Sequence, residues 1–264
     1  MIINGKEIAE ALFEELEEER AHIGRPLALG ILMSQGDVAT ESFIKIKARA
    51  ADRLGVEVVR HELLSGSATA DALMALEELA TKTQGVIVQL PLQLPIDAEA
   101  VLAHLAPEKD VDAIGPKPHV APAPVARAVM RILDWTHTDV SGKKAVVVGA
   151  GRLVGKPTAE LLTEHGAHVT FVTKEAGSLE ELKDADIVVL GAGNPGFIKP
   201  SMIKPGVVLI DAGTSESVGG KLVGDADPAC ANMASVFTPV PGGVGPIAIA
   251  MIFKNLFELA RKHV

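Results

Sequence analysis

Short apolar runs alternate along the first half of the chain with segments in which apolar residues recur every three or four positions. The runs predict buried strands, and the helical spacing predicts amphipathic helices. The predicted strands are Pro26–Met33, Val56–Leu63 and Gly85–Leu90. The predicted helices begin near Gly5 and span Thr40–Leu54, Thr69–Ala80 and Ala98–Leu105. Strands that alternate with helices in this way predict a parallel α/β unit.

The same alternation resumes after a proline-rich stretch at Gly115–Pro124, which we interpret as a linker or a cleft-lining segment. A helix over Val125–Trp135 leads into a second predicted α/β domain. Its predicted strands are Lys144–Val148, His168–Val172, Asp186–Leu190 and Val207–Ile210. An apolar helix that opens at Gly245 is expected to pack back on the first domain. The expected division is 1–120 plus 248–264 for one domain and 121–247 for the other.

A glycine-rich turn follows the first strand of the second domain. Gly149, Gly151 and Gly155 lie between the apolar run Ala145–Val148 and a segment of helical spacing. A strand, a glycine turn and a helix start bring backbone N–H groups up to a phosphate. The spacing is one residue longer than the common dinucleotide fingerprint, so a tight turn without a ligand is the alternative. The context favours a Rossmann-type nucleotide site, whose expected residues are Gly149, Gly151, Arg152, Leu153, Val154, Gly155, Thr173, Lys174 and Gly193.

Composition narrows the class of protein further. The 264 residues carry a net charge of -9 and no basic tract, which argues against a nucleic-acid partner. No run of 18 apolar residues predicts a membrane span, and the N-terminus lacks the features of a signal peptide. Cys230 is the single cysteine, which excludes an internal disulfide and a thiolate metal cluster. We expect a cytoplasmic protein without a metal site.

Lys47 admits two interpretations. It lies one helical turn after Phe43, on the side of the predicted helix that also carries Ala50 and Leu54. In the first interpretation its stem lies along this apolar surface and its charge reaches water. In the second it is a catalytic lysine whose pKa is lowered by partial burial. The helix alone favours the first interpretation.

Three further segments favour the second. Gln89 ends a buried strand, at the edge where α/β proteins bind ligands. The loop at 109–113 carries two carboxylates, of which Asp110 is suited to cap backbone and Asp112 to meet N–H donors of a ligand. The segment 238–246 alternates prolines with glycines before a helix start, which indicates a rigid, shaped surface.

Taken together, these segments resemble the bifunctional methylenetetrahydrofolate dehydrogenase/methenyltetrahydrofolate cyclohydrolase family nearly end to end. The motifs are F-x-x-x-K, G-V-I-V-Q-L-P-L, K-D-V-D, G-A-G-R-L-V-G-K-P and T-P-V-P-G-G-V-G-P. The resemblance implies two α/β domains that flank a cleft, a bound tetrahydrofolate derivative, NADP or NAD, and a homodimer. It implies Lys47, Gln89 and Asp112 as catalytic residues. It implies substrate binding by Phe43, Val88, Leu90, Pro91, Pro241, Gly242, Gly243 and Pro246.

The chain also departs from the family pattern. Phe43 stands where the family has a tyrosine, Ala123 where it has a threonine, and Ile247-Ala248 where it has methionine-threonine. The segment between Asp112 and the glycine turn looks short. Three substrate-facing hydroxyls are thereby absent, and hydrolysis is the activity more exposed to their loss. The alternatives are a dehydrogenase without hydrolysis, a folate- or nucleotide-binding protein with decayed catalysis, and a shikimate-type dehydrogenase, against which the 238–246 loop argues.

The choice of nucleotide depends on the residues after the strand His168–Val172. A cation there suits the additional phosphate of NADP, whereas an acidic residue accepts from the ribose hydroxyls of NAD. Lys174 and Glu175 stand side by side, and Arg152 in the glycine turn adds a second cation. The sequence therefore predicts NADP, with NAD as the alternative.

Overall fold

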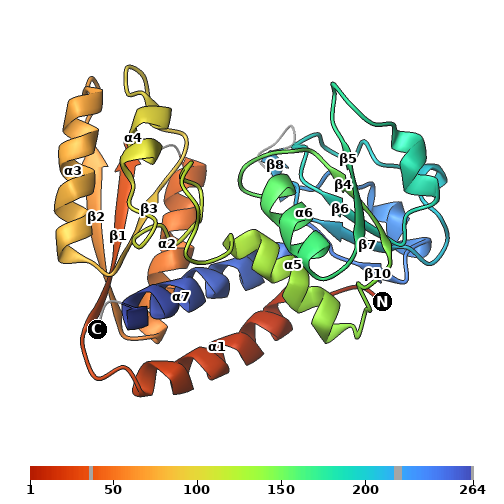
Figure 1. The fold of residues 1–264 in the computed structure, drawn as a ribbon, viewed down its shortest axis with the longest axis horizontal. Coiled ribbons are helices and arrows are strands. Elements are labelled where there is room, and N and C mark those ends of the chain that lie inside the picture. Colours follow the sequence, from red (N-terminus) through yellow and green to blue (C-terminus); the bar gives the residue numbers. More distant parts are fainter. Residues whose placement is uncertain (36–37, 217–221, 263–264) are drawn as a thin grey trace. The chain divides into compact units, whose positions relative to one another are not determined.

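The computed structural model describes residues 1–35, 38–216 and 222–262, which form two compact units (Figure 1). We call the unit that contains Lys47 the lysine unit; it comprises Leu12–Pro124 and Ile249–Val264. The glycine unit comprises Met1–Ala11 and Val125–Ala248. Among the described residues, no helix is long and apolar enough to cross a membrane.

The lysine unit is built on a parallel sheet of order β2-β1-β3. Strand β1 (Leu27–Ser34) pairs with β2 (Val56–Leu63) on one side and with β3 (Gly85–Val88) on the other. All eight residues of β1 are buried, as expected of the central strand of a covered parallel sheet. The predicted parallel α/β architecture is confirmed. Strand β3 ends at Val88, two residues before the predicted end at Leu90. Pro91 comes directly after Leu90 and lacks the N–H donor that a longer strand would need.

Helices complete the lysine unit. They are α2 (Val38–Arg53), α3 (Thr69–Lys82), α4 (Ala98–His104), the second part of α1 (Gly5–Ala21) and most of α7 (Val244–Lys262). Leu76 and Leu79 of α3 share a buried core with Val101 of α4. In α7, the side chain of Asn255 donates hydrogen bonds to the carbonyls of Val111 and Pro122, both at 2.8 Å. The prediction that the terminal helix packs on the first domain is confirmed.

The glycine unit carries a second parallel sheet, of order β10-β7-β6-β4-β5. Its strands are β4 (Lys144–Val148), β5 (His168–Val172), β6 (Ile187–Leu190), β7 (Val208–Asp211) and β10 (Val236–Phe237). Helix α5 (Pro124–Trp135) precedes β4, and α6 (Gly155–Glu164) connects β4 to β5. A short antiparallel pair, β8 (Ser215–Glu216) and β9 (Leu222–Val223), was not predicted, because two-residue strands carry no periodicity.

The sheet of the glycine unit has a topological switch point. Strand β5 lies on one side of β4, and β6 and then β7 lie on the other. This is the Rossmann order with its outermost strand on the β5 side absent among the described residues. Ligands of such sheets bind at the carboxyl ends of the strands, where the order reverses. The fold therefore directs attention to the turn after β4.

The first eleven residues differ from the expected division of the chain. We assigned them to the first domain, but they belong to the glycine unit. The backbone N–H of Ile3 donates to the carbonyl of Phe237 at 2.8 Å, and that of Gly5 donates to Gly242 at 2.9 Å. The segment thus pairs with β10 and with the following loop, a long-range contact that sequence periodicity does not encode.

Candidate functional site

Lys47 is buried in the lysine unit. Only 8% of its surface is exposed, and its ammonium group donates a hydrogen bond of 2.8 Å to Oε1 of Gln89. Ile44, Ala50 and Leu54 share the buried side of this helix and the turn that follows it. The interpretation of Lys47 as a lysine whose charge reaches water is therefore wrong. The predicted partnership of Lys47 with Gln89 is present in the geometry.

Gln89 is held in place at the end of β3. Its backbone N–H donates to the carbonyl of Leu32 at 2.8 Å, and its side-chain amide donates to the carbonyl of Leu90 at 3.1 Å. The second bond fixes which face of the amide carries oxygen, so that Oε1 accepts from Lys47. A position directly after a buried parallel strand thus aims a polar group at the lysine.

Asp112 adds a carboxylate to this pair. Burial lowers the pKa of Lys47 from its usual value, and the charge of Asp112 opposes this shift. Conversely, burial raises the pKa of Asp112, and the charge of Lys47 opposes that shift. Each group shields the other from part of the cost of desolvation. The three predicted catalytic residues therefore form one cluster with an amine, an amide and a carboxyl group, in which Lys47 is buried and Gln89 and Asp112 are half-buried.

The loop that carries Asp112 is fixed by residues that sequence reasoning assigned only in part. Oδ2 of Asp110 accepts from the N–H groups of Ile114 at 2.9 Å and Gly115 at 2.8 Å, as predicted for a backbone cap. Asn255, wholly buried on α7, binds the carbonyl of Val111, next to Asp112. We did not predict Asn255; a lone amide within an apolar helix was the signal available for it.

The predicted substrate residues of the lysine unit are close in sequence to Lys47 or Gln89. Phe43 is 38% exposed, one turn before Lys47 on α2. Val88 is buried at the end of β3, Leu90 is half-buried, and Pro91 is exposed. Phe43 is partly exposed, whereas Lys47, one helical turn later, is buried, so the two residues are not equally buried as expected.

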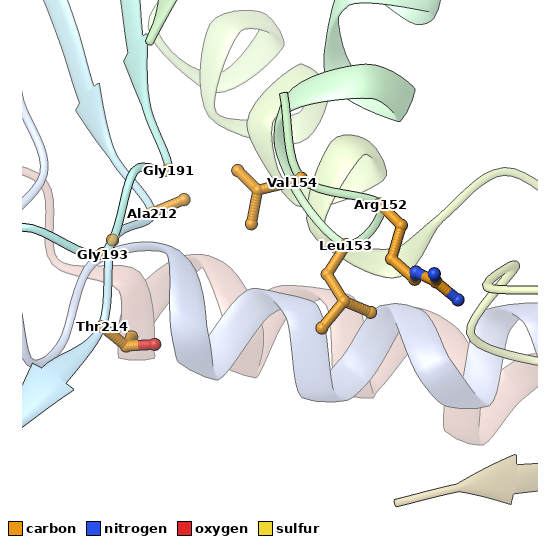
Figure 2. A pocket seen from close by; sticks show the side chains of 9 residues that line it. Arg152, Leu153, Val154, Gly191, Gly193, Ala212 and Thr214 are labelled. Atoms are coloured by element: carbon orange, nitrogen blue, oxygen red, sulfur yellow. The ribbon is translucent and has the colours of Figure 1, made fainter. Parts of the chain in front are cut away.

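A pocket of about 250 Å³ lies at the switch point of the glycine unit (Figure 2). Its lining comes from the turn after β4 and from the segments after β6 and β7. The lining residues are Gly151, Arg152, Leu153, Val154, Gly191, Gly193, Ala212, Gly213 and Thr214. Five of these were predicted. Leu153 and Val154 extend between the two sides, whereas the Arg152 side chain points away from Gly193 and Thr214 (Figure 2).

The three glycines of the turn have different surroundings. Gly149 has a φ of +94°, and a Cβ atom on Gly155 would lie 1.9 Å from the carbonyl oxygen of Gly149. These two glycines permit the tight turn and the close approach of helix to strand. A Cβ atom on Gly151 would meet nothing within 4 Å. Gly151 therefore leaves open space at the start of α6, where backbone N–H groups meet a phosphate.

Other predicted residues lie outside this lining. Gly149 and Gly155 allow the tight turn but do not line the pocket, and Thr173 and Lys174 follow β5. The Thr173 hydroxyl accepts from the N–H of Glu175 at 3.2 Å and of Ala176 at 3.1 Å, and Lys174 is exposed. Gly191, Ala212, Gly213 and Thr214 were not predicted. Their position directly after β6 and β7 was the available signal.

The loop 238–246 belongs to the glycine unit. Thr238 is wholly buried, and its hydroxyl oxygen accepts from the backbone N–H of Asp211 at 2.6 Å and donates to the carbonyl of Asp211 at 3.2 Å. The N–H of Gly243 donates to the carbonyl of Pro239 at 2.8 Å, which closes the loop on itself. Of the predicted substrate residues here, Pro241 is exposed, Gly242 and Pro246 are half-buried, and Gly243 is buried. The loop is thus held at its start by the buried side chain of Thr238.

The glycine unit has a sheet of Rossmann order with a glycine-lined pocket at its switch point, and the lysine unit of the same chain holds the Lys47 cluster. These features define a two-domain, nucleotide-dependent α/β enzyme. Two family models match it: the catalytic domain of tetrahydrofolate dehydrogenase/cyclohydrolase over residues 3–112, and its NAD(P)-binding domain over residues 123–264. The chain belongs to the tetrahydrofolate dehydrogenase/cyclohydrolase family.

Individual relatives agree with this assignment. The chain is 37% identical to the Bifunctional protein FolD of Halothermothrix orenii, with 99% of this chain and 98% of the relative covered. It is 38% identical to that of Magnetococcus marinus, with 99% and 97% covered. The expectation of a short family member is therefore wrong, since the match is full-length.

Solved structures show the same fold. The bifunctional FolD enzyme of Campylobacter jejuni has a TM-score of 0.93 at 28% identity, with 100% of this chain and 99% of that chain covered. The FolD enzyme of Trypanosoma brucei, complexed with NADP cofactor and inhibitor, has a TM-score of 0.91 at 31% identity, with 100% and 98% covered. A shikimate 5-dehydrogenase of Thermus thermophilus shares the fold at a TM-score of 0.57 and 19% identity. The similarity to shikimate dehydrogenase therefore concerns the fold alone.

Proposed function

We propose that this protein oxidises methylenetetrahydrofolate to methenyltetrahydrofolate with NADP, and hydrolyses the methenyl form to formyltetrahydrofolate. The observation that carries the proposal is the hydrogen bond of 2.8 Å from the amine of the buried Lys47 to Gln89, with the charge of Asp112 acting on the same amine. Burying a lysine is costly, and a purely structural site has no need of one. The lysine unit takes the folate, and the glycine unit takes the nucleotide.

The residues of the glycine unit fit a dinucleotide. Gly151 offers open space at the start of α6, and Gly149 and Gly155 allow the turn that aims backbone N–H groups at a pyrophosphate. A nicotinamide bound here would supply the hydride acceptor. Gly151–Gly155 would hold the phosphates, while the segments that carry Gly193 and Thr214 would bound the remainder of the cofactor.

Dehydrogenation places few chemical demands on the protein. The C–H bond of the bridging methylene breaks with its electron pair, and a delocalised methenyl cation remains on the folate. No base is required, so the side chains act by orienting the two rings. Asp112 is suited to accept hydrogen bonds from N–H groups of the pterin, and Gln89 holds Lys47 beside it.

Hydrolysis requires proton movement. Water attacks the methenyl carbon, a C–O bond forms, one C–N bond breaks, and one proton is released overall. Burial lowers the pKa of Lys47 and so brings its amine closer to accepting a proton near neutral pH. Lys47 is the proposed group that holds the attacking water and moves its proton, with Gln89 as the residue that orients the amine.

Two absorbance measurements test the proposed function. Methylenetetrahydrofolate with NADP should yield reduced nicotinamide, and added methenyltetrahydrofolate should lose its absorbance faster than without enzyme. Reduction of nucleotide without accelerated hydrolysis would favour the dehydrogenase-only alternative. Folate binding without either signal would favour a binding protein with decayed catalysis.

NADP is proposed as the preferred nucleotide. Lys174 follows β5, where the adenosine ribose of a Rossmann ligand lies, and its ammonium group suits the 2′-phosphate. Lys174→Ala is expected to raise the KM for NADP about tenfold, the loss of roughly one charge-assisted contact, and to leave the KM for NAD unchanged. Glu175→Ala is the matched control. A preference for NAD that survives Lys174→Ala would contradict the choice of NADP.

Phe43→Tyr is expected to raise hydrolysis more than hydride transfer. The new hydroxyl would lie one helical turn from Lys47 and would add a hydrogen-bond partner for the amine. One hydrogen bond to a charged group is worth about 1.5–3 kcal/mol, so an increase of about tenfold or more is expected. Both rates are measured on the variant and the parent. Fast parental hydrolysis that does not respond to the substitution would contradict this role for the hydroxyl.

The proposed enzyme is a cytoplasmic homodimer. A single buried cysteine suits a reducing compartment, and the resemblance to the family implies the dimer. Light scattering of the purified protein measures the mass in solution and tests the dimer.

A further inference from the structure

Two buried carboxylates lie behind the nucleotide pocket of the glycine unit. Asp211 ends β7 and is 2% exposed, and Asp225 follows β9 and is wholly buried. Burial raises the pKa of Asp211 to about 6, and the nearby charge of Asp225 adds to that shift. Neither residue lines the pocket, so the proposed mechanism leaves both unexplained.

Asp225 gathers the turn that follows β6. Its Oδ2 atom accepts from the N–H groups of Ala192 at 2.7 Å and Gly193 at 3.1 Å, and its Oδ1 atom accepts from Asn194 at 2.7 Å. Three consecutive backbone donors thus converge on one carboxylate. Gly193 lines the pocket, so these bonds fix the wall on this side (Figure 2).

The second wall packs against the same carboxylate. A Cβ atom on Gly213 would lie 2.3 Å from Cγ of Asp225, so the backbone of this pocket residue approaches the carboxylate directly. Asp211 holds the same segment, because its Oδ1 atom accepts from the N–H of Gly213 at 2.9 Å. Asp225 therefore sits between the segment after β6 and the segment after β7.

The direction of these hydrogen bonds indicates what the wall binds. The N–H groups of Ala192, Gly193 and Asn194 are engaged with Asp225, so they are not donors to a ligand phosphate. The pyrophosphate belongs at the start of α6 instead. The segment after β6 then bounds the nicotinamide end of the dinucleotide, which carries no phosphate group on its ring.

We propose that Asp225 is a positioning residue of the nucleotide site, which pre-forms the wall at the nicotinamide end through three backbone hydrogen bonds. The inference rests on the proposed function in that it takes a nicotinamide dinucleotide as the ligand. A carboxylate is needed because only two oxygen acceptors satisfy three donors; an amide would set its own NH₂ group against one of them. A pre-formed wall lowers the cost of ordering the protein on binding.

Asp225→Asn is the test, with Asp227→Asn as the matched control. Asp227 lies two residues on, accepts from the N–H of Ala229 at 2.9 Å and pairs with Lys199 at 3.1 Å. Calorimetric titration with NADP is expected to show a Kd about tenfold or more higher for Asp225→Asn, and an unchanged Kd for the control. The Kd for the folate is expected to stay within about twofold in both variants, which a general loss of structure would not allow.

The possible outcomes separate the two proposals. An unchanged Kd for NADP in a folded Asp225→Asn protein would overturn the positioning role. Failure of the parent to bind either NADP or NAD would instead overturn the proposed function. If the Asp225→Asn variant does not fold, hydrogen exchange measured on the parent protein tests the proposal instead. Residues 192–194 are expected to exchange slowly without nucleotide, and rapid exchange that slows only on binding NADP would overturn a pre-formed wall.

Discussion

Lys47→Ala is expected to lower hydrolysis of methenyltetrahydrofolate by about a hundredfold or more while hydride transfer continues, since positioned acid–base groups contribute roughly 10²–10⁴-fold. Only hydrolysis moves a proton near the reacting carbon. The substitution removes the amine that donates to Gln89 and whose pKa burial has lowered. Dehydrogenation should lose only the part that depends on orienting the folate.

Lys45→Ala is the control, because Lys45 is exposed on the same helix. Both rates are measured on each variant, together with the unfolding midpoint. Burial disfavours the charged lysine, but its removal also takes away the charge that offsets the burial of Asp112, so the unfolding midpoint is expected to fall without loss of the fold. Complete loss of both activities in a folded Lys47→Ala protein would contradict the division of labour proposed for this site.

Alanine at Gly155 and alanine at Gly151 are both expected to weaken nucleotide binding, but only the first is expected to destabilise the fold. In Gly155→Ala the new Cβ atom would lie 1.9 Å from a carbonyl oxygen, so backbone must shift at a cost of roughly 1–3 kcal/mol or more. Its unfolding midpoint should fall and nucleotide binding should be lost. In Gly151→Ala the Cβ atom meets no protein atom within 4 Å. The fold should persist, but the approach of a phosphate is obstructed and the Kd for NADP should rise about tenfold or more.

Gly24→Ala is the control for this pair. It lies in the lysine unit, where an added Cβ atom likewise meets nothing within 4 Å. Thermal unfolding and titration with NADP on all three variants separate a folding role from a binding role. A Gly151→Ala protein that binds NADP as tightly as the parent would place the phosphates elsewhere.

The regular elements were predictable because their apolar periodicity extends over whole strands and helices. Strand β2 occupies the predicted residues Val56–Leu63, and α3 begins at the predicted Thr69. Two-residue strands such as β8 and β10 carry no such pattern. The pairing of Ile3 with Phe237 joins residues far apart in sequence, and no local signal predicts it.

The candidate site was predictable where one residue type is costly in its setting. A polar Gln89 after a buried strand and two carboxylates in one loop were signals of this kind, and Gln89 contacts Lys47 directly. The environment of Lys47 was mispredicted from its helix because burial depends on what packs against it. The residues that support the site, Asn255 and Asp225, act through backbone groups of distant segments, and such partners are visible only after folding.

The bond between Thr238 and Asp211 has a consequence for the thermodynamics of binding. Asp211 accepts a hydrogen bond from the backbone of Gly213, which lines the pocket of the glycine unit, and Thr238 begins the loop 238–246, for which the resemblance to the family implies substrate binding. A ligand that orders one of these segments therefore reduces the conformational freedom that remains to the other. Coupling of this kind is reciprocal, so each ligand is expected to raise the affinity for the other by the same factor.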